Sequence, residues 1–478
     1  MILDIAIWGC IFFCLGATQY LSGYGSEQTT ARPILQHEPF VVVWNIPTAR
    51  CQEHFGITLP LRLYGIVENQ DNVFQGQNMT IFYKNKFGLY PFISSDGEWN
   101  YGGIPQNVYL KDHLEKASKE IAELLNPDFQ GLAVVDWEEW RPLWRRNWGD
   151  QTVYRKASKQ WVQERLPNLP EEEQSYLAEV QFEQAAQALM ERTLEMGKAM
   201  RPQGLWGFYN FPDCFNDNWE KENYTGSCKP LEVQWNDKLM WLWQVSSALY
   251  PSIYLSPKLP APYHQHYVHH RLREALRVAQ FGTEQPLPVI AYSRVSYRQS
   301  SRYLTEDDLV NTIGESAALG AAGVVLWGDL SYSRSPESCR SLRHYIDTVL
   351  GPYVVKVSMA ARSCSHHWCH GNGRCVRQHP DDLGTFLHLD PEAWKEESER
   401  TNVLDQEGIS WEAFQCHCYP GWTGSWCEKP QWMDPVKGLE CNRVSPYYNV
   451  YDVEHDGNVL VNSRVCPPSK YDEKTAFQ

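Results

Sequence analysis

The chain has 478 residues, which is long enough for one large domain with a sizeable core and a smaller unit beside it. Its formal net charge of -15 argues against nucleic acid as a partner, because proteins that bind phosphate chains usually present a basic face. The 20 tryptophans and 26 tyrosines instead favour a protein that is densely packed or that faces carbohydrate.

The N-terminal residues have the pattern of a secretory signal. An apolar run over residues 5–16 is too short to span a membrane as a helix, and small and polar residues follow it. We therefore expect a signal peptide over residues 1–25. Without Cys10 and Cys14, twelve of the 14 cysteines remain, an even number consistent with six disulfides in an oxidising compartment. The chain is expected to be secreted or lysosomal, by way of the secretory pathway.

Two further features fit an exported chain. Asn78 and Asn223 each begin an Asn-X-Thr sequence, the acceptor pattern for N-glycosylation. The residues after Cys427 lack the apolar tail that a lipid-anchor signal requires. We therefore expect a soluble glycoprotein without a membrane span.

Short apolar runs alternate with segments of helical spacing along the chain, which is the pattern of a βα barrel. Helices are predicted to begin after Pro170 and at Thr305, because acidic residues follow both positions and favour the first turn of a helix. Seven candidate strands alternate with the helical segments: Phe40–Trp44, Thr80–Tyr83, Leu132–Val135, Leu205–Tyr209, Ser252–Leu255, Val289–Tyr292 and Gly323–Trp327.

Two carboxylates follow the third of these strands. Leu132–Val135 is an apolar run that predicts a strand buried on both faces, and Asp136 and Glu138 come directly after it. Positions i and i+2 of an extended chain point to the same side, so both carboxylates should enter one space. In a parallel barrel, catalytic groups lie at this end of the strands. Mutual repulsion should raise one pKa, so that this group can act as an acid near neutral pH.

Paired acids of this kind are typical of enzymes that cleave a glycosidic bond. The alternative is a solvated polar rim that caps the strand without catalytic role, and a bare Asp-X-Glu sequence is more often such a rim. Four flanking tryptophans favour the catalytic interpretation, because aromatic rings beside paired acids suit sugar rings: Trp137, Trp140, Trp144 and Trp148.

The wider pattern resembles one family. Five segments occur in that family's order between residues 38 and 428: D-W-E-E-W-R-P at 136–142, W-G-F-Y-N-F-P-D-C at 206–214, A-L-Y-P-S-I-Y at 248–254, G-E-S-A-A-L-G-A-A-G-V-V-L-W at 314–327 and C-H-C-Y-P-G-W at 416–422. The chain resembles the hyaluronidases of animals, glycoside hydrolases that act on hyaluronan. The resemblance implies an α/β fold, a distorted TIM-like (β/α) barrel followed by a small disulfide-rich EGF-like module.

The resemblance and the change of composition near Pro352 predict three regions after the signal peptide. We expect a catalytic barrel over 26–355, an EGF-like module with a polar insert over 356–428, and a C-terminal tail of unknown role over 429–478. The implied disulfides are Cys51–Cys339, Cys214–Cys228, Cys364–Cys375, Cys369–Cys416 and Cys418–Cys427, and the two remaining cysteines are expected to form Cys441–Cys466. A zinc site is the competing interpretation of the cysteines with His366, His367, His370 and His417, but an oxidising compartment favours disulfides, and we expect no metal and no cofactor.

The chemistry that the resemblance implies retains configuration and uses the N-acetyl carbonyl of the substrate as the nucleophile. Glu138 is then the general acid and afterwards the base that activates water, while Asp136 stabilises the acetamido group. Tyr209 and Tyr254 would stand beside the acetamido carbonyl, and Trp327 would face the acetyl methyl group.

Other residues match substrate contacts or structural positions. Arg271 matches an arginine thought to bind the carboxylates of the substrate, a task that suits a guanidinium fork, and Tyr83 and Asn45 match further substrate contacts. Glu139 points to the other face of the strand, so we expect it to be exposed or paired. Arg141 and Arg146 are expected to pair with acids behind the barrel rim.

The sequence departs from the family pattern at two positions. Phe215 stands where a tyrosine often follows Pro-Asp-Cys. Arg298 occupies a position that is acidic in some active relatives, which leaves the pH optimum and the strength of the activity open.

The leading hypothesis is therefore an endo-acting hyaluronidase that cleaves the β-1,4 N-acetylglucosaminide bonds of hyaluronan. One alternative is an enzyme that degrades mainly chondroitin. Another is a weakly active hyaluronan-binding surface protein, against which five intact candidate residues argue: Asp136, Glu138, Tyr209, Tyr254 and Trp327. The oligomeric state is open.

Overall fold

The computed structural model describes residues 29–282, 285–389 and 411–431. The predicted signal peptide over 1–25, the predicted Cys441–Cys466 pair and almost all of the predicted tail lie outside these residues. Within them, no helix is long and apolar enough to cross a membrane.

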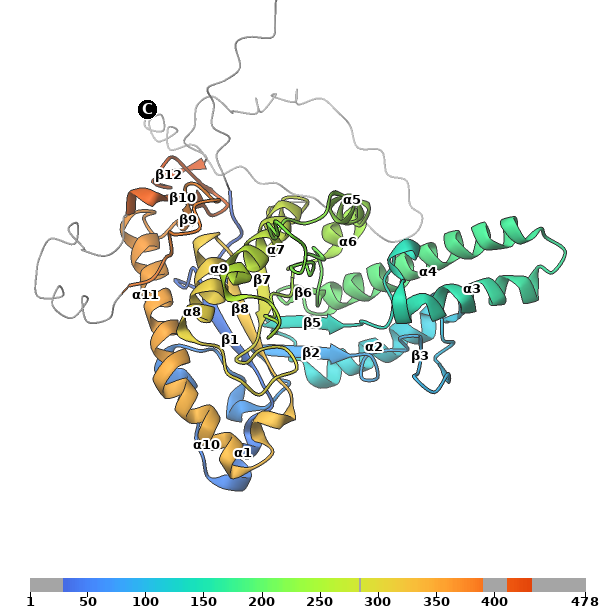
Figure 1. The fold of residues 1–478 in the computed structure, drawn as a ribbon, viewed down its shortest axis with the longest axis horizontal. Helices are drawn as coiled ribbons and strands as arrows, with labels where there is room; N and C mark the ends of the chain where they lie inside the picture. Colours follow the sequence, from blue (N-terminus) through green and yellow to red (C-terminus); the bar gives the residue numbers. More distant parts are fainter. Residues whose placement is uncertain (1–28, 283–284, 390–410, 432–478) are drawn as a thin grey trace, which may run out of the picture. The chain divides into compact units, whose positions relative to one another are not determined.

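The centre of the molecule consists of parallel strands, as the sequence predicted (Figure 1). Six strands form two parallel sheets of three, in the orders β1-β8-β7 and β2-β5-β6. Both faces of each strand are buried, which explains their continuous apolar runs. The strands are β1 Val41–Asn45, β2 Met79–Tyr83, β5 Leu132–Asp136, β6 Leu205–Phe208, β7 Ile290–Ser293 and β8 Gly323–Trp327.

The predicted strand Ser252–Leu255 is wrong. Residues 249–252 pair instead through isolated bridges, Leu249 with Val289, Tyr250 with Tyr209 and Phe211, and Ser252 with Tyr292. Pro251 lies within these residues, just before the predicted strand, and has no N–H to donate, so it interrupts a regular ladder. The segment nevertheless joins β6 to β7.

The opposite join, between β1 and β2, is also irregular. Val67 pairs with Val43 of β1, and the buried Asn69 side chain then bonds both the N–H and the C=O of Met79 in β2, at 3.0 and 2.8 Å. A side-chain amide therefore takes the place of a strand residue. The barrel is closed at two irregular joins, and the predicted distorted form of the α/β barrel is confirmed.

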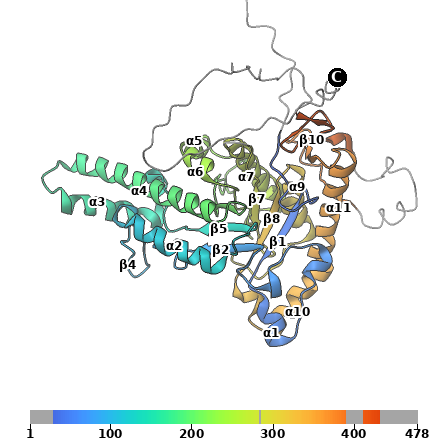
Figure 2. The ribbon, with the colours of Figure 1, turned by 180° about the vertical axis from the view of Figure 1, so that it is seen from behind.

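Helices cover the outside of the strands (Figures 1 and 2). The predicted helix starts are confirmed: Glu171–Glu173 occupy the first turn of α4, and Thr305 and Asp308 form a capping box at the start of α8. The α-helices are α1 Ala49–Phe55, α2 Leu110–Leu124, α3 Thr152–Arg165, α4 Glu171–Met200, α5 Pro230–Lys238, α6 Met240–Val245, α7 His264–Ala279, α8 Glu306–Leu309, α9 Glu315–Ala318, α10 Pro336–Tyr345 and α11 Gly351–His367.

The alternation of side chains along the strands decides what enters the barrel. Leu132 and Val134 of β5 pack in the interior cluster, together with residues of the other strands such as Val43 and Val325. Ala133 and Val135 point the other way, into the layer under the helices. Asp136 continues the series of Leu132 and Val134, so strand geometry directs its carboxylate into the mouth of the barrel.

The C-terminal described region is rich in disulfides. It contains the antiparallel pair β9 Gly373–Arg377 and β10 Phe414–Cys418, and the short pair β11 Trp422–Thr423 and β12 Lys429–Pro430. Helix α11 runs without a break through the predicted domain boundary at residue 355 and carries Cys364, so it joins this region to the barrel.

Five of the six predicted disulfides are present: Cys51–Cys339, Cys214–Cys228, Cys364–Cys375, Cys369–Cys416 and Cys418–Cys427. The sulfurs of Cys369, Cys375 and Cys416 lie close together, as they would around a metal. All three are in disulfides, however, and offer no thiolate as a ligand. The zinc interpretation of these cysteines is therefore excluded.

We predict that alkylation of the non-reduced protein labels none of the ten cysteines in these five disulfides, because each sulfur has a partner at bonding distance. Peptide mass spectrometry of the alkylated chain checks this result. Reduction before alkylation is the control and should make all ten reactive. Labelling of Cys51 or Cys339 without reduction would contradict the pairing that ties α1 to α10.

Candidate active site

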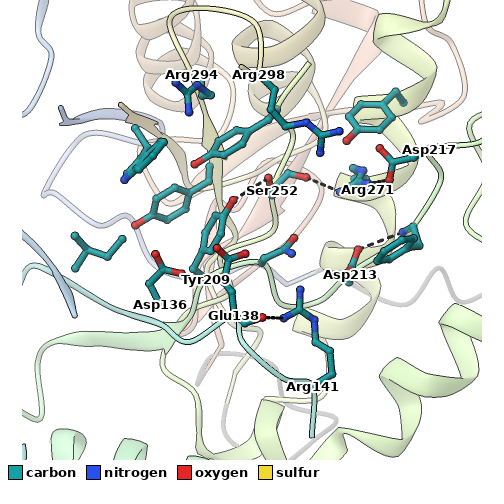
Figure 3. Close-up of a pocket in the computed structure, with 17 residues that line it drawn as sticks. Asp136, Glu138, Arg141, Tyr209, Asp213, Asp217, Ser252, Arg271, Arg294 and Arg298 are labelled. Carbon is teal, nitrogen blue, oxygen red and sulfur yellow. Dashed lines mark hydrogen bonds and ion pairs between the residues drawn. The ribbon is translucent and has the colours of Figure 1, made fainter. Parts of the chain in front are cut away.

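A cavity of about 360 Å³ opens at the carboxyl ends of the strands (Figure 3). Side chains from β5, β8 and the segments after β6 and β7 meet there, as expected for a parallel barrel. Six of the eight predicted catalytic and substrate-contact residues line this one cavity: Asp136, Glu138, Tyr209, Tyr254, Arg271 and Trp327.

The two carboxylates of the Asp-Trp-Glu sequence share this space. Asp136 ends β5 and is partly buried, and its Oδ1 has no hydrogen-bond partner within the described part of the chain. Burial, and then the charge of Glu138, raise the pKa of Asp136. Glu138 is reached by solvent through the mouth, yet protein surrounds it on several sides, and this desolvation raises its pKa while Arg141 lowers it. The pair therefore tends to hold one proton between its two members.

Aromatic residues form the wall beside the carboxylates. Tyr254 and Trp327 stack with ring centroids 6.2 Å apart, and Tyr209 lies 6.1 Å from Tyr254. The Tyr209 hydroxyl donates to Ser252 Oγ at 3.4 Å. Burial raises the pKa of both Tyr209 and Tyr254, so each phenol keeps its proton and can serve as a hydrogen-bond donor.

Tyr83 and Asn45 do not line the cavity. Tyr83 accepts a hydrogen bond from Trp327 Nε1 at 3.0 Å and so fixes the orientation of the indole. Asn45 is fully buried at the end of β1, where its Nδ2 donates to the carbonyl of Phe74 at 3.2 Å. The structure thus places both residues behind the wall, where they hold it in position.

Arg271 lines the cavity, but its guanidinium is already engaged. It donates to Asn216 Oδ1 at 2.8 Å, to the Ser252 carbonyl at 3.0 Å and to Asp217 at 3.0 Å. It also lies over the Tyr267 ring, 4.4 Å from the centroid. These contacts tie three segments of the wall together.

The tryptophans of the motif are mostly structural, contrary to the expectation that they suit sugar rings. Trp137, Trp140 and Trp144 are buried, with 3%, 2% and 6% exposure. Trp137 and Trp140 stack on Tyr90 at 4.7 and 5.2 Å. Only Trp148 among the four is available to a ligand, at 52% exposure.

Other charged residues of the motif differ in role. Glu139 pairs with Lys84, as expected, and lies outside this cavity, although it lines an adjoining one. Arg146 grips acids as predicted, because its Nη2 lies 3.1 Å from both Asp213 and Glu232, and all three side chains are buried. Arg141 does not. Its Nη1 donates to the backbone carbonyl of Glu138 at 3.3 Å and the side chain lines the cavity.

Sequence reasoning missed several lining residues, among them Asp213, Asp217, Ser252, Tyr267 and Arg294. Arg294 could have been found, because it directly follows β7 at the same end of the barrel as Asp136. Tyr267 lies within a helix, where nothing local distinguishes it from a core tyrosine.

The hollow continues on the other side of Glu138. A second cavity of about 470 Å³ shares Glu138 with the first, and a third of about 350 Å³ shares Arg141 and Phe215 with it. The second and third cavities share Gln151 with each other. Phe215, one of the two departures from the family pattern, packs edge-on against the exposed Trp148 here, at 5.1 Å.

The chain is similar to known proteins over most of its length. Residues 29–431 match the protein family described as Hyaluronidase. Human Hyaluronidase-3 is 49% identical over 423 residues, covering 88% of this chain and 95% of that protein, and pig Hyaluronidase-1 is 41% identical, covering 86% and 97%. The crystal structure of bee venom hyaluronidase in complex with a hyaluronic acid tetramer superposes with a TM-score of 0.61 at 31% identity, covering 66% of this chain and 98% of that one.

We predict that Arg146→Met lowers the free energy of unfolding by about 3–5 kcal/mol, because it leaves Asp213 and Glu232 buried without their cation. Urea unfolding followed by tryptophan fluorescence measures this loss. Arg192→Met is the matched control, since the Arg192–Glu195 pair is exposed, and it should cost no more than about 1 kcal/mol. Equal stabilities of the two variants would show that the buried pair has no structural role.

Proposed function

Since the chain belongs to the hyaluronidase family, we propose that it is an endo-acting glycoside hydrolase that cleaves the β-1,4 N-acetylglucosaminide bonds of hyaluronan with retention of configuration. The observation that carries the proposal is the Asp136–Glu138 pair in one cavity, beside two protonated tyrosines. The substrate's own N-acetyl carbonyl is the nucleophile in this proposal.

The two carboxylates divide the work according to their positions. Glu138, at the solvent-reached mouth, donates its proton to the leaving glycosidic oxygen as the bond to the anomeric carbon breaks. Asp136, deeper in the barrel, accepts a hydrogen bond from the acetamido N–H and stabilises its growing positive charge while the carbonyl oxygen attacks that carbon. Glu138, now ionised, then takes a proton from the water that opens the intermediate.

The aromatic wall is suited to holding the acetamido group. The phenols of Tyr209 and Tyr254 are hydrogen-bond donors at neutral pH, and Trp327 offers an apolar ring to the methyl group. Tyr83 fixes the indole before a substrate binds. The single proton of Tyr209 is donated to Ser252 Oγ, 3.4 Å away, in the unliganded protein, and it turns from Ser252 to the acetamido carbonyl when the substrate binds. A donor that is already in place stabilises the charge that develops in the reaction.

Cleavage within a chain requires room on both sides of the scissile bond. The adjoining cavities on the two sides of Glu138 offer that room, and the exposed Trp148 offers a ring on which a sugar can pack. A pocket closed beyond Glu138 would instead suit removal of terminal sugars. The open hollow therefore supports the endo-acting mode.

We also propose that the chain is an exported glycoprotein, secreted or lysosomal. Its five disulfides need an oxidising compartment to form. Asn78 and Asn223, the two glycosylation acceptors, are both exposed, so a glycan on either would project into solvent.

Glu138→Gln should reduce kcat on hyaluronan by at least about 10²–10⁴-fold while hyaluronan binding persists, because the amide keeps the shape of the side chain but loses the proton donor. Glu139→Gln is the control for kcat, since Glu139 pairs with Lys84 and lies outside the cavity that contains Asp136 and the aromatic wall, although it lines the adjoining one, and it should change kcat little. The assay is the release of reducing ends together with oligosaccharide binding. Near-normal turnover in a folded Glu138→Gln protein would overturn the proposal.

The pH dependence of kcat follows from the shared proton. Because burial raises the pKa of both carboxylates, the singly protonated pair persists to higher pH than free acids would, and activity should fall once pH exceeds these raised values. Arg141 lowers the pKa of Glu138, so Arg141→Gln should move this alkaline fall to higher pH. Arg145→Gln, which changes an exposed arginine outside the cavity, should leave it in place.

Profiles of kcat from about pH 3 to 8 at two ionic strengths check this expectation, since salt screens charges on the open surface more than charges inside a cavity. A profile of the unaltered protein that stays flat to pH 8 at both salt concentrations would show that Glu138 is not the titrating acid.

A further inference from the structure

Four arginines line the cavity that contains Glu138, and they differ in how far they are engaged. Arg271 makes three hydrogen bonds to the protein. Arg294 lies 3.5 Å from Asp329 and over the Trp327 ring, and Arg141 donates to a backbone carbonyl. Within residues 29–282, 285–389 and 411–431, the guanidinium of Arg298 has no hydrogen bond or ion pair, and its side chain is exposed.

The backbone that carries Arg298 is held firmly, although its side chain is free. The Arg298 N–H donates to the carbonyl of Leu255 at 2.8 Å, directly after Tyr254. The preceding Tyr297 is buried, and its hydroxyl donates to Asp308, which also bonds His264 at 2.7 Å. Arg298 is therefore fixed relative to the wall formed by Tyr254.

The acids of the cavity do not neutralise Arg298. Asp217 pairs with Arg271, and Asp213 pairs with Arg146. In Figure 3, Arg294 and Arg298 lie along one edge of the cavity, and Glu138 and Arg141 lie along the opposite edge. A positive guanidinium thus stands free at the edge away from the catalytic acid, in a chain whose net charge is -15.

A sugar carboxylate matches this position. In hyaluronan every N-acetylated sugar is flanked by uronates, so an acetamido group against Tyr254 and Trp327 brings a carboxylate to a neighbouring part of the cavity. We propose that Arg298 binds the carboxylate of that uronate, the role that the sequence assigned to Arg271. The inference rests on the proposed function, and it makes Arg271 a positioning residue that holds Ser252 and the segment at Asn216 in place.

The test compares hyaluronan oligosaccharides that carry free carboxylates with the same oligosaccharides as neutral methyl esters. Dissociation constants are measured in the Glu138→Gln background, where no turnover disturbs binding. The Glu138→Gln protein that retains Arg298 should bind the acid form about 10- to 100-fold more tightly than the ester, the range for a hydrogen bond between charged groups. Arg298→Gln should lose this preference by weakening acid binding alone, and Arg298→Lys should restore part of it.

Arg302→Gln is the matched control. Arg302 lies in the same loop, is exposed and rests over the Tyr297 ring at 4.2 Å, but it does not line the cavity. Its loss should leave the preference for the acid form unchanged. An Arg298→Gln protein that prefers the acid as strongly as its parent would overturn the proposal.

Failure of the proposed function gives a different result. If the unaltered protein cleaves no hyaluronan at any pH, the hydrolase proposal fails. A preference for the acid form that disappears with Arg298→Gln would still support the carboxylate site, because binding is measured without turnover.

Discussion

The carboxylate of Asp136 lies at the end of a strand whose preceding four side chains are all buried. The other features of the site depend on the free-energy cost of ionising a carboxylate at that position. A carboxylate with an unpartnered oxygen beside a second acid is destabilised in its ionised form. The fold keeps it there because side chains on β5 alternate, and the apolar Leu132 and Val134 on the same face are anchored in the barrel interior.

Aromatic packing supports the turn that follows Asp136. Trp137 and Trp140 stack on Tyr90, and Trp140 Nε1 donates to the Pro91 carbonyl at 2.8 Å. The Tyr90 hydroxyl in turn accepts from the backbone N–H of Glu139 at 3.1 Å. The tryptophans thus fix the backbone on either side of Glu138, whose side chain is the most exposed of residues 136–142.

Much of the barrel and its central acids could be predicted from the sequence, because both depend on local patterns. A continuous apolar run identifies a doubly buried strand, and the two-residue spacing puts Asp136 and Glu138 on one side. The strand expected at Ser252–Leu255 is wrong because Pro251, just before it, interrupts the ladder, and residues 249–252 pair through isolated bridges to distant parts of the chain such as Val289 and Tyr292.

The functional assignment of the arginines could not be predicted in the same way. Whether a guanidinium is free or engaged depends on partners far away in the chain. Arg271 is occupied by Asn216 and Asp217 from before α5, and Arg146 by Asp213 and Glu232. The exposure of the tryptophans could not be predicted from the sequence either. Trp137 and Trp148 both flank the paired acids, but their exposed fractions are 3% and 52%.

In the proposed mechanism, the Asp136–Glu138 pair serves a substrate whose own acetamido oxygen is the nucleophile. The most direct test is kcat for hyaluronan oligosaccharides whose N-acetyl groups carry increasing numbers of fluorines, which weaken the carbonyl oxygen as a nucleophile and change its shape little. We expect a steep fall in kcat with each added fluorine, while the dissociation constant in the Glu138→Gln protein changes little. A kcat that is independent of fluorination would contradict it and point to a nucleophile supplied by the protein or by water.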